Sequence, residues 1–182
     1  VYTLVFTTIM PMKGIDKFYL HLFVALIPWG FFASCLTGGC ASIINQQDMV
    51  KKIYFPREVL PIAYVTGQFV NMLFSFVVVF VVLFISGVGV RVEALLCLPL
   101  VMIVQYIFCI GITMLTSAVT VYLRDVQQIL SVLSLALMYA SPVIYSVDMV
   151  PASIRGIYML NPMSVLIVSY RDLLYYRQLP DM

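Results

Sequence analysis

The residues that could carry chemistry are few and scattered in this sequence. It contains eight Asp and Glu residues, four cysteines and a single histidine, His21. None of the motifs H-E-x-x-H, G-x-S-x-G or G-x-x-x-x-G-K-[ST] occurs, so the spacings of zinc hydrolases, serine hydrolases and phosphate-binding loops are absent. We therefore expect no catalytic residues, no metal and no cofactor bound by this chain. If ATP drives its work, a separate polypeptide must bind the ATP and Mg²⁺.

The cysteines and the histidine have simpler explanations than catalysis. Cys35, Cys40, Cys97 and Cys109 all lie in apolar stretches, and none of them forms a C-x-x-C pair. We interpret them as small packing residues, with a disulfide or a metal site as the alternative. His21 lies near the end of an apolar stretch, which favours a position at the membrane interface over a catalytic role.

Most of the chain is free of charge over stretches long enough to cross a membrane. Of 182 residues 63% are hydrophobic and 10% charged, with a mean hydropathy of +1.07. Soluble domains are nearer half apolar and a quarter charged. Four stretches without Asp, Glu, Lys or Arg hold 30, 32, 30 and 22 residues, and about 20 helical residues cross the hydrocarbon core. This predicts an all-α integral membrane protein, and the net charge of +2 is too small to indicate nucleic acid.

The uncharged stretches define the helices that we expect. Residues 1–10 are too short to cross a membrane and are interpreted as the end of a first helix whose start is missing. A run of small residues around Gly38 and Gly39 should let the first complete helix approach its neighbours closely. Only 15 residues separate Arg155 from Arg171, which suits a re-entrant or interfacial segment. The complete spans are expected at residues 20–42, 62–86, 94–120 and 129–146, and the last is expected to be interrupted near its end by Ser141-Pro142.

Uncharged polar residues recur at helical spacing within three of these spans. In a bilayer such residues should face protein or water rather than lipid. Helix packing is one interpretation and a translocation path is the other. Because the sets contain no charged residue, they argue against a carrier driven by protons or sodium. The sets are Tyr64, Gln68, Asn71 and Ser75, then Thr113, Thr116, Ser117 and Thr120, and finally Gln127, Ser131, Ser134 and Ser141.

The polar break at residues 43–61 has the most distinctive sequence. It contains five charged residues and two prolines, and a short helix is expected from Gln46 to Phe55, before Pro56. Its motif NQQDMVKKIYFPREVLP resembles the cytoplasmic loop of type-2 ABC transporter permeases that export polysaccharides. Further matching pieces follow in the same order: YLRDVQQ at 122–128, SPVIY at 141–145, the pairs Val150-Pro151 and Asn161-Pro162, and SYRDLLYY at 169–176.

This resemblance implies a fold and a location. Subunits of that family have six membrane helices, so residues 1–182 would form one incomplete transmembrane permease domain. It would contain the end of helix one, helices two to five and an extracytoplasmic gate or re-entrant segment at 147–182, with helix six missing. The resemblance places residues 43–61 and 121–128 in the cytoplasm, whereas a count of Lys and Arg alone favours the opposite orientation. A multi-pass protein of the bacterial cytoplasmic (inner) membrane is expected.

The resemblance also implies partners and a coupling site. The permease would form a homodimer, dock on two ATP-binding ABC subunits and move a lipid-linked glycan of the O-antigen (lipopolysaccharide), capsule or teichoic acid type. The loop at 43–61 would contain the coupling helix, where charged residues offer ion pairs and aromatic residues offer anchors. The same residues would also suit an ordinary positively charged loop. The expected coupling residues are Asp48, Lys51, Lys52, Tyr54, Phe55, Pro56, Arg57, Glu58, Arg124 and Asp125.

Two more groups of residues would serve the cargo. A sugar polymer needs a hydrated path with aromatic faces and few fixed charges, although aromatic residues are also common in packing and as interfacial anchors. The expected path residues are Trp29, Phe32, Tyr106, Tyr139 and Tyr145. The resemblance places a gate at Ser141, Pro142, Pro151, Asn161 and Pro162.

Three other functions compete with polysaccharide export. A type-2 permease for drugs or lipids would look alike, and neighbouring genes for glycosyltransferases would favour the glycan. A membrane-embedded acyl- or glycosyltransferase would need polar catalytic groups near the end of a span, and none cluster there. A structural membrane protein without a transport role is the third, and co-purification with an ATPase would argue against both of the last two.

Overall fold

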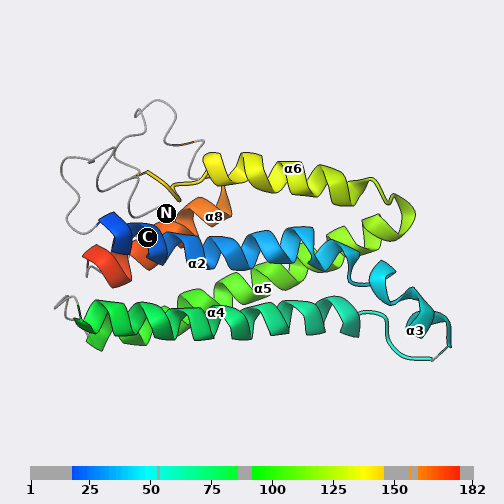
Figure 1. Cartoon of the computed structure of the whole chain (residues 1–182), viewed down its shortest axis with the longest axis horizontal. Helices are drawn as coiled ribbons and strands as arrows, with labels where there is room; N and C mark the ends of the chain where they lie inside the picture. Colours follow the sequence, from blue (N-terminus) through cyan, green and yellow to red (C-terminus); the bar gives the residue numbers. More distant parts are fainter. Residues whose placement is uncertain (1–17, 53, 86–91, 146–155, 157–159, 177–182) are drawn as a thin grey trace.

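The computed structural model describes residues 18–52, 54–85, 92–145, 156 and 160–176. Four helices run along its long axis (Figure 1): α2 (Phe18–Thr37), α4 (Val59–Ile85), α5 (Val92–Tyr122) and α6 (Val126–Tyr139). One end holds the short turns η2 (Gly39–Ala41) and η3 (Ile44–Gln46) and helix α3 (Gln47–Lys52). The other end holds α8 (Pro162–Arg171) and the π-helical turn η5 (Asp172–Tyr176).

Three helical segments are long and apolar enough to cross a bilayer. They are Leu20–Ala41, Val59–Ile85 and Leu96–Tyr122, which confirms the first three predicted spans to within a few residues. Helix α4 begins three residues earlier than predicted because Pro61 lies in its first turn, where proline removes no helical hydrogen bond. Exposed apolar side chains such as Phe74, Phe84 and Leu96 cover the outer faces of α4 and α5. These faces suit contact with lipid rather than water.

The fourth predicted span is interrupted at Ser141-Pro142 as expected, but its helix is shorter than a complete membrane span. Helix α6 begins at Val126 and ends at Tyr139, and its 14 residues rise only about 21 Å, which is less than the hydrocarbon core of about 30 Å. Continuing the helix would bring the ring of Pro142 against the carbonyl of Met138. The chain instead turns at Ala140, and residues 141–145 return toward α8.

Helix α2 is the centre of the bundle. In the most apolar part of this first span 61% of the residues are buried, whereas the corresponding share is 22% in α4 and 28% in α5. It packs against α4, α5, α6 and α8, and Figure 1 shows it between α4 and α6. Trp29 lies against Phe32, and Phe32 stacks on Phe108 of α5 with 6.0 Å between ring centroids. The middle of the bundle is therefore held by aromatic packing.

The end of α2 approaches two neighbouring helices closely at consecutive glycines. A methyl group added to Gly38 would overlap the phenol of Tyr64 on α4. One added to Gly39 would lie 2.5 Å from Cγ2 of Thr113 on α5. Since a side chain at either position would require a neighbouring residue to move, the predicted role of small residues in close helix approach is confirmed here.

We expect Gly39→Ala to lower the free energy of unfolding by about 1–3 kcal/mol, the usual cost of overpacking. Thermal unfolding of the detergent-solubilised protein would measure the change. Gly111→Ala is the matched control, because a methyl group at Gly111 meets no atom within 4 Å. Equal melting temperatures for the two variants would contradict the close approach at Gly39.

Candidate coupling surface and gate

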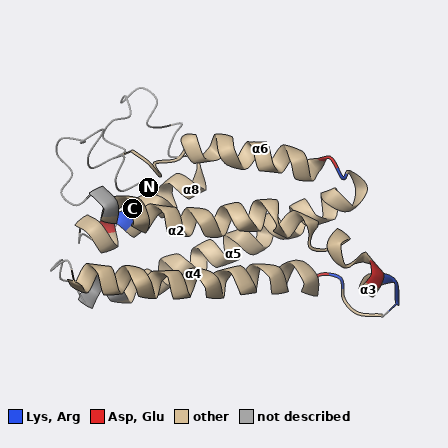
Figure 2. Cartoon of the chain, in the orientation of Figure 1, with Lys and Arg blue, Asp and Glu red and all other residues tan. Residues whose placement is uncertain are grey.

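The two polar connections at one end of the bundle lie together. Figure 2 shows charged residues gathered near the two ends, with long uncharged helices between them. One end carries α3, the loop that leads into α4, and the turn between α5 and α6. The prediction that residues 43–61 and 121–128 share one side is confirmed, whereas their assignment to the cytoplasm remains a prediction.

Helix α3 is shorter than predicted. It begins at Gln47 and ends at Lys52, three residues before the predicted end at Phe55. The ring of Pro56 disfavours helical geometry in the residue before it, so the chain leaves the helix ahead of this proline. Asp48 lies in the first turn and basic residues lie in the last, which is the favourable order for the helix dipole. No residue of α3 is buried.

The loop after α3 contains an aromatic residue, Tyr54, that is unusually exposed. Tyr54 is fully exposed, at 105% of its reference area, whereas Phe55 is half-buried. Arg57 and Glu58 are exposed as well. The amide of Val59 donates to the carbonyl of Pro56 at 3.2 Å, so a single tight turn leads from this loop into α4. A displacement of the loop would thus act directly on a membrane helix.

The second connection is a tight turn that carries an adjacent base and acid. The amide of Val126 donates to the carbonyl of Leu123 at 3.2 Å, and the amide of Gln128 donates to the carbonyl of Asp125 at 3.0 Å. Arg124 and Asp125 are both exposed. The structure brings them to the same end as α3, and the coupling role of both segments remains a prediction.

The predicted gate residues meet where the chain returns from α6. Asn161 caps α8: its Oδ1 accepts from the amide of Met163 at 3.0 Å, and Pro162 occupies the first helical position. Its Nδ2 donates to Oγ of Ser141 at 2.9 Å. The structure therefore joins Ser141 to Asn161, with Pro142 buried beside them. Pro151 lies outside the described residues.

Arg171 completes this junction and was not among the predicted gate residues. Its Nη1 donates to the carbonyl oxygen of Tyr145 at 2.9 Å and its Nη2 to that of Val143 at 2.7 Å. Only 3% of the side chain is exposed. These two carbonyl groups follow the end of α6 and lie outside a helix. One guanidinium donates a hydrogen bond to each of them. The sequence signal that could have identified Arg171 is a charged residue between two apolar runs.

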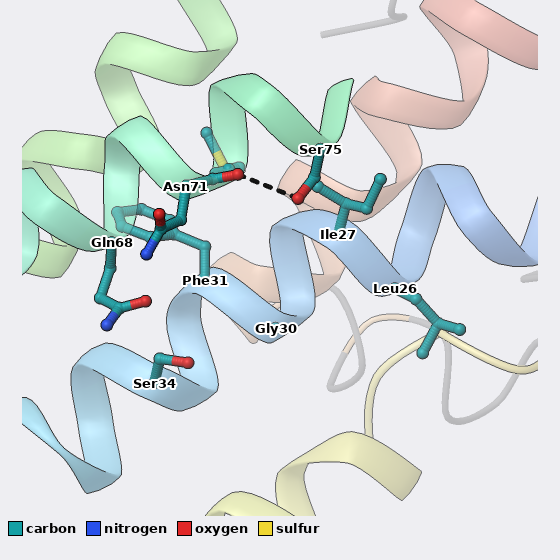
Figure 3. Close-up of a pocket in the computed structure, with 9 residues that line it drawn as sticks. Leu26, Ile27, Gly30, Phe31, Ser34, Gln68, Asn71 and Ser75 are labelled. Atoms are coloured by element: carbon teal, nitrogen blue, oxygen red, sulfur yellow. Dashed lines mark hydrogen bonds between the residues drawn. The ribbon is translucent and has the colours of Figure 1, made fainter. Parts of the chain in front are cut away.

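Three of the four residues in the polar set on α4, all except Tyr64, line a pocket of about 310 Å³ between α2 and α4. Figure 3 shows Gln68, Asn71 and Ser75 of α4 facing Gly30 and Ser34 of α2 across this pocket. The hydroxyl of Ser75 donates to the carbonyl of Asn71 at 2.9 Å. These side chains are uncharged hydrogen-bonding groups, as expected for either protein contacts or a hydrated path.

The other two polar sets behave differently. In α5 the hydroxyls of Thr116 and Thr120 donate to backbone carbonyls of their own helix. The hydroxyl of Thr113 donates to the backbone carbonyl of Cys35 in α2 at 3.4 Å. This set serves helix packing. The α6 set is split, because Gln127 and Ser131 are exposed whereas Ser134 and Ser141 are buried.

The predicted path residues lie in three environments. Trp29 and Phe32 are each 4% exposed and belong to the packed core, so this structure gives them no free face for a glycan. Tyr106 is half-buried against Phe69, and its hydroxyl lies 2.8 Å from Oγ1 of Thr66. The ring of Tyr139 is exposed, and the hydroxyl of Tyr145 donates to the carbonyl of Tyr139 at 2.9 Å.

Gln105 is a second residue that the sequence analysis missed. It is fully buried in α5, where its Nε2 donates to the carbonyl of Pro28 at 2.8 Å. Its Oε1 accepts from the hydroxyl of Tyr170 in α8 at 2.8 Å. One carboxamide therefore joins α2, α5 and α8. An amide in an otherwise apolar run was the signal that could have identified it.

The histidine and cysteines do not form a chemical site. His21 lies near the start of α2 as expected, but it is fully buried beneath η5, with its ring edge-on to Tyr175 at 5.2 Å. Its place beside Leu20, where the first span begins, agrees with the predicted location near the end of a span. The interfacial depth remains a prediction, and at that place the ring is covered by protein. All four cysteines are free, and Cys35, Cys40 and Cys109 are buried. Within the described residues, no group of three His, Cys, Asp or Glu side chains could hold a metal ion.

Comparison with known proteins agrees with the motifs in the polar loops. The ABC-2 type transporter family matches residues 1–175. The O-antigen export system permease protein RfbA of Klebsiella pneumoniae is 31% identical over 173 residues, which cover 95% of this chain and 66% of that protein. The protein of the same name from Myxococcus xanthus is 33% identical over 183 residues, covering 100% and 70%. The chain thus spans about two thirds of the length of these relatives.

The matches extend over the helices, the polar connections and the predicted gate region alike. They confirm the family that the loop motifs indicated, and the apolar helices agree with a multi-pass membrane protein. The chain therefore belongs to the ABC-2 type transporter family.

Proposed function

We propose that this chain is a permease subunit of an ATP-driven exporter that moves a lipid-linked polysaccharide across the bacterial cytoplasmic membrane. The observation that carries this proposal is the similarity to two proteins named as O-antigen export permeases, over 95% and 100% of the chain. Because the chain spans about two thirds of their length, the activity is proposed for the whole protein.

The proposed partners follow from the exposed coupling surface. Two copies of the permease would dock on two ATPase subunits, which bind the ATP and Mg²⁺. Helix α3 has no buried residue, and Tyr54 beside it is fully exposed, as suits an aromatic anchor for a cleft on the ATPase. The turn from Pro56 into α4 would pass the motion of the ATPase to the membrane helices.

The proposed cargo suits the uncharged polar groups of the bundle. Hydroxyl-rich sugars are bound by amides, hydroxyls and aromatic faces, and the pocket between α2 and α4 offers Gln68, Asn71 and Ser34. Exposed Tyr139 and half-buried Tyr106 are the better candidates for sugar contact among the predicted path residues. Opening of the junction between Ser141 and Asn161 would release the cargo on the far side.

Deleting the gene in a bacterium that carries it should abolish the surface polysaccharide and leave lipid-linked polymer accumulated inside the cell. Electrophoresis of the polymer from intact cells and from lysates would measure both effects. The full-length gene, returned on a plasmid, is the control and should restore surface polymer. Normal surface polymer combined with increased sensitivity to drugs would instead indicate a drug-exporting permease.

A further inference from the structure

A second cavity lies at the end of the bundle that carries α3. It is an open cavity of about 540 Å³, lined by the segment after α2, by α3 and the loop that follows it, and by the end of α5 with the turn after it. Its wall combines three basic side chains, one amide and four aliphatic side chains. These are Lys51, Arg57 and Arg124, then Gln47, and then Ile43, Ile44, Val50 and Val121.

The charged side chains that line this cavity are all basic. Neither Asp48 nor Glu58 lines it, and no acidic residue does so among the described residues. Across the part of the chain that the structure describes, Lys51, Arg57 and Arg124 form no ion pair. Three converging cations repel one another, and an anion between them would turn that repulsion into attraction.

The depth of the cavity selects the kind of anion. The first span ends at Ala41, two residues before Ile43, and the third ends at Tyr122, directly after Val121. The aliphatic residues Ile43 and Val121 therefore lie at the ends of two segments that are long and apolar enough to cross a membrane. This is the level of lipid headgroups.

We propose that this cavity binds the phosphate-bearing headgroup of an anionic membrane lipid. The two arginines offer paired N–H donors to the phosphate oxygens, and Lys51 adds a compact charge. The aliphatic wall continues the apolar surface of the bundle and contacts the acyl-chain carbons nearest the headgroup. Lys51, Arg57 and Arg124 then serve the lipid, whereas Asp48, Lys52 and Tyr54 remain for the ATPase. This site does not depend on the cargo proposed above.

Thermal unfolding of the purified protein in micelles doped with phosphatidylglycerol tests the site, because a ligand of the folded state raises the melting temperature. The wild-type protein should be stabilised by phosphatidylglycerol and much less by zwitterionic phosphatidylcholine. Arg57→Gln and Arg124→Gln should each weaken the apparent lipid affinity about fivefold. Lys52→Gln is the matched control: it removes the same charge from α3 but does not line the cavity, and its affinity should remain within about twofold of wild type.

Three results would overturn the proposal. If Lys52→Gln weakens lipid binding as much as Arg57→Gln, the effect is diffuse attraction rather than a site. If inorganic phosphate at millimolar concentration displaces phosphatidylglycerol, the cavity takes a free anion. If the arginine variants bind lipid normally but lose the ATPase subunit, the anion is an acidic side chain of that partner. Should a glutamine variant fold poorly, Arg57→Lys keeps the charge without the paired donors and should show a partial loss.

Discussion

Replacing Arg171 with leucine is expected to lower the free energy of unfolding by about 3–5 kcal/mol, because two buried charge-assisted hydrogen bonds are lost. The guanidinium satisfies the carbonyls of Val143 and Tyr145, and leucine leaves both carbonyls without that donor. Thermal unfolding in detergent measures the loss. Hydrogen exchange over residues 141–145 should rise in the same variant, since the turn is released from α8.

The control for Arg171→Leu lies on the same helix. Ser169→Ala removes a hydroxyl that donates only to the carbonyl of Val165, within its own turn, and should change stability little. Arg171→Lys should fall between the two, because a lysine ammonium cannot reproduce the planar fork of the guanidinium. Unchanged exchange in Arg171→Leu would show that the turn is held by other contacts.

Truncating Tyr54 to alanine is expected to weaken binding of the proposed ATPase subunit at least about thirtyfold, the loss typical of an aromatic hot spot. The side chain is fully exposed in the isolated subunit, so its removal should leave the stability of the permease itself unchanged. Titration of the solubilised permease with its purified ATPase subunit measures the affinity. Tyr54→Phe should retain most of it, because the ring supplies the buried area.

A control variant at a distant exposed aromatic residue distinguishes loss of a specific anchor from a general loss of exposed apolar surface. Phe84 near the other end of α4 is 88% exposed, and Phe84→Ala should leave ATPase affinity unchanged. If Tyr54→Ala binds the ATPase as tightly as wild type, the exposed ring is not part of the interface. The coupling surface would then have to be sought on the charged residues alone.

The membrane helices were predictable because lipid penalises charge at every level of a span. The absence of charge between Glu93 and Arg124 therefore marked α5 to within two residues at each end. The loop motifs indicated the family because their charged, aromatic and proline residues stand out between long uncharged stretches. Both signals are local in the sequence, and neither requires knowledge of which helices are neighbours.

The junction at the gate was only half predictable, because it depends on contacts between distant parts of the chain. Ser141 and Asn161 were identified by resemblance, but their hydrogen bond spans 20 residues. Arg171 reaches carbonyls 26 and 28 residues earlier, and no spacing rule selects those partners. The same limit applies to the fourth span: the interruption at Pro142 was predicted, but the turn toward α8 that follows it was not.

The buried carboxamide of Gln105 has a consequence for the order of membrane assembly. Helices α2 and α5 leave the ribosome before α8, so the bond from Gln105 to Pro28 can form first. Its Oε1 then faces a medium without water and gains its partner only when Tyr170 has been synthesised. A nascent chain that stops before Tyr170 keeps an open acceptor in the middle of its bundle. Docking of α8 is therefore the step that satisfies this acceptor.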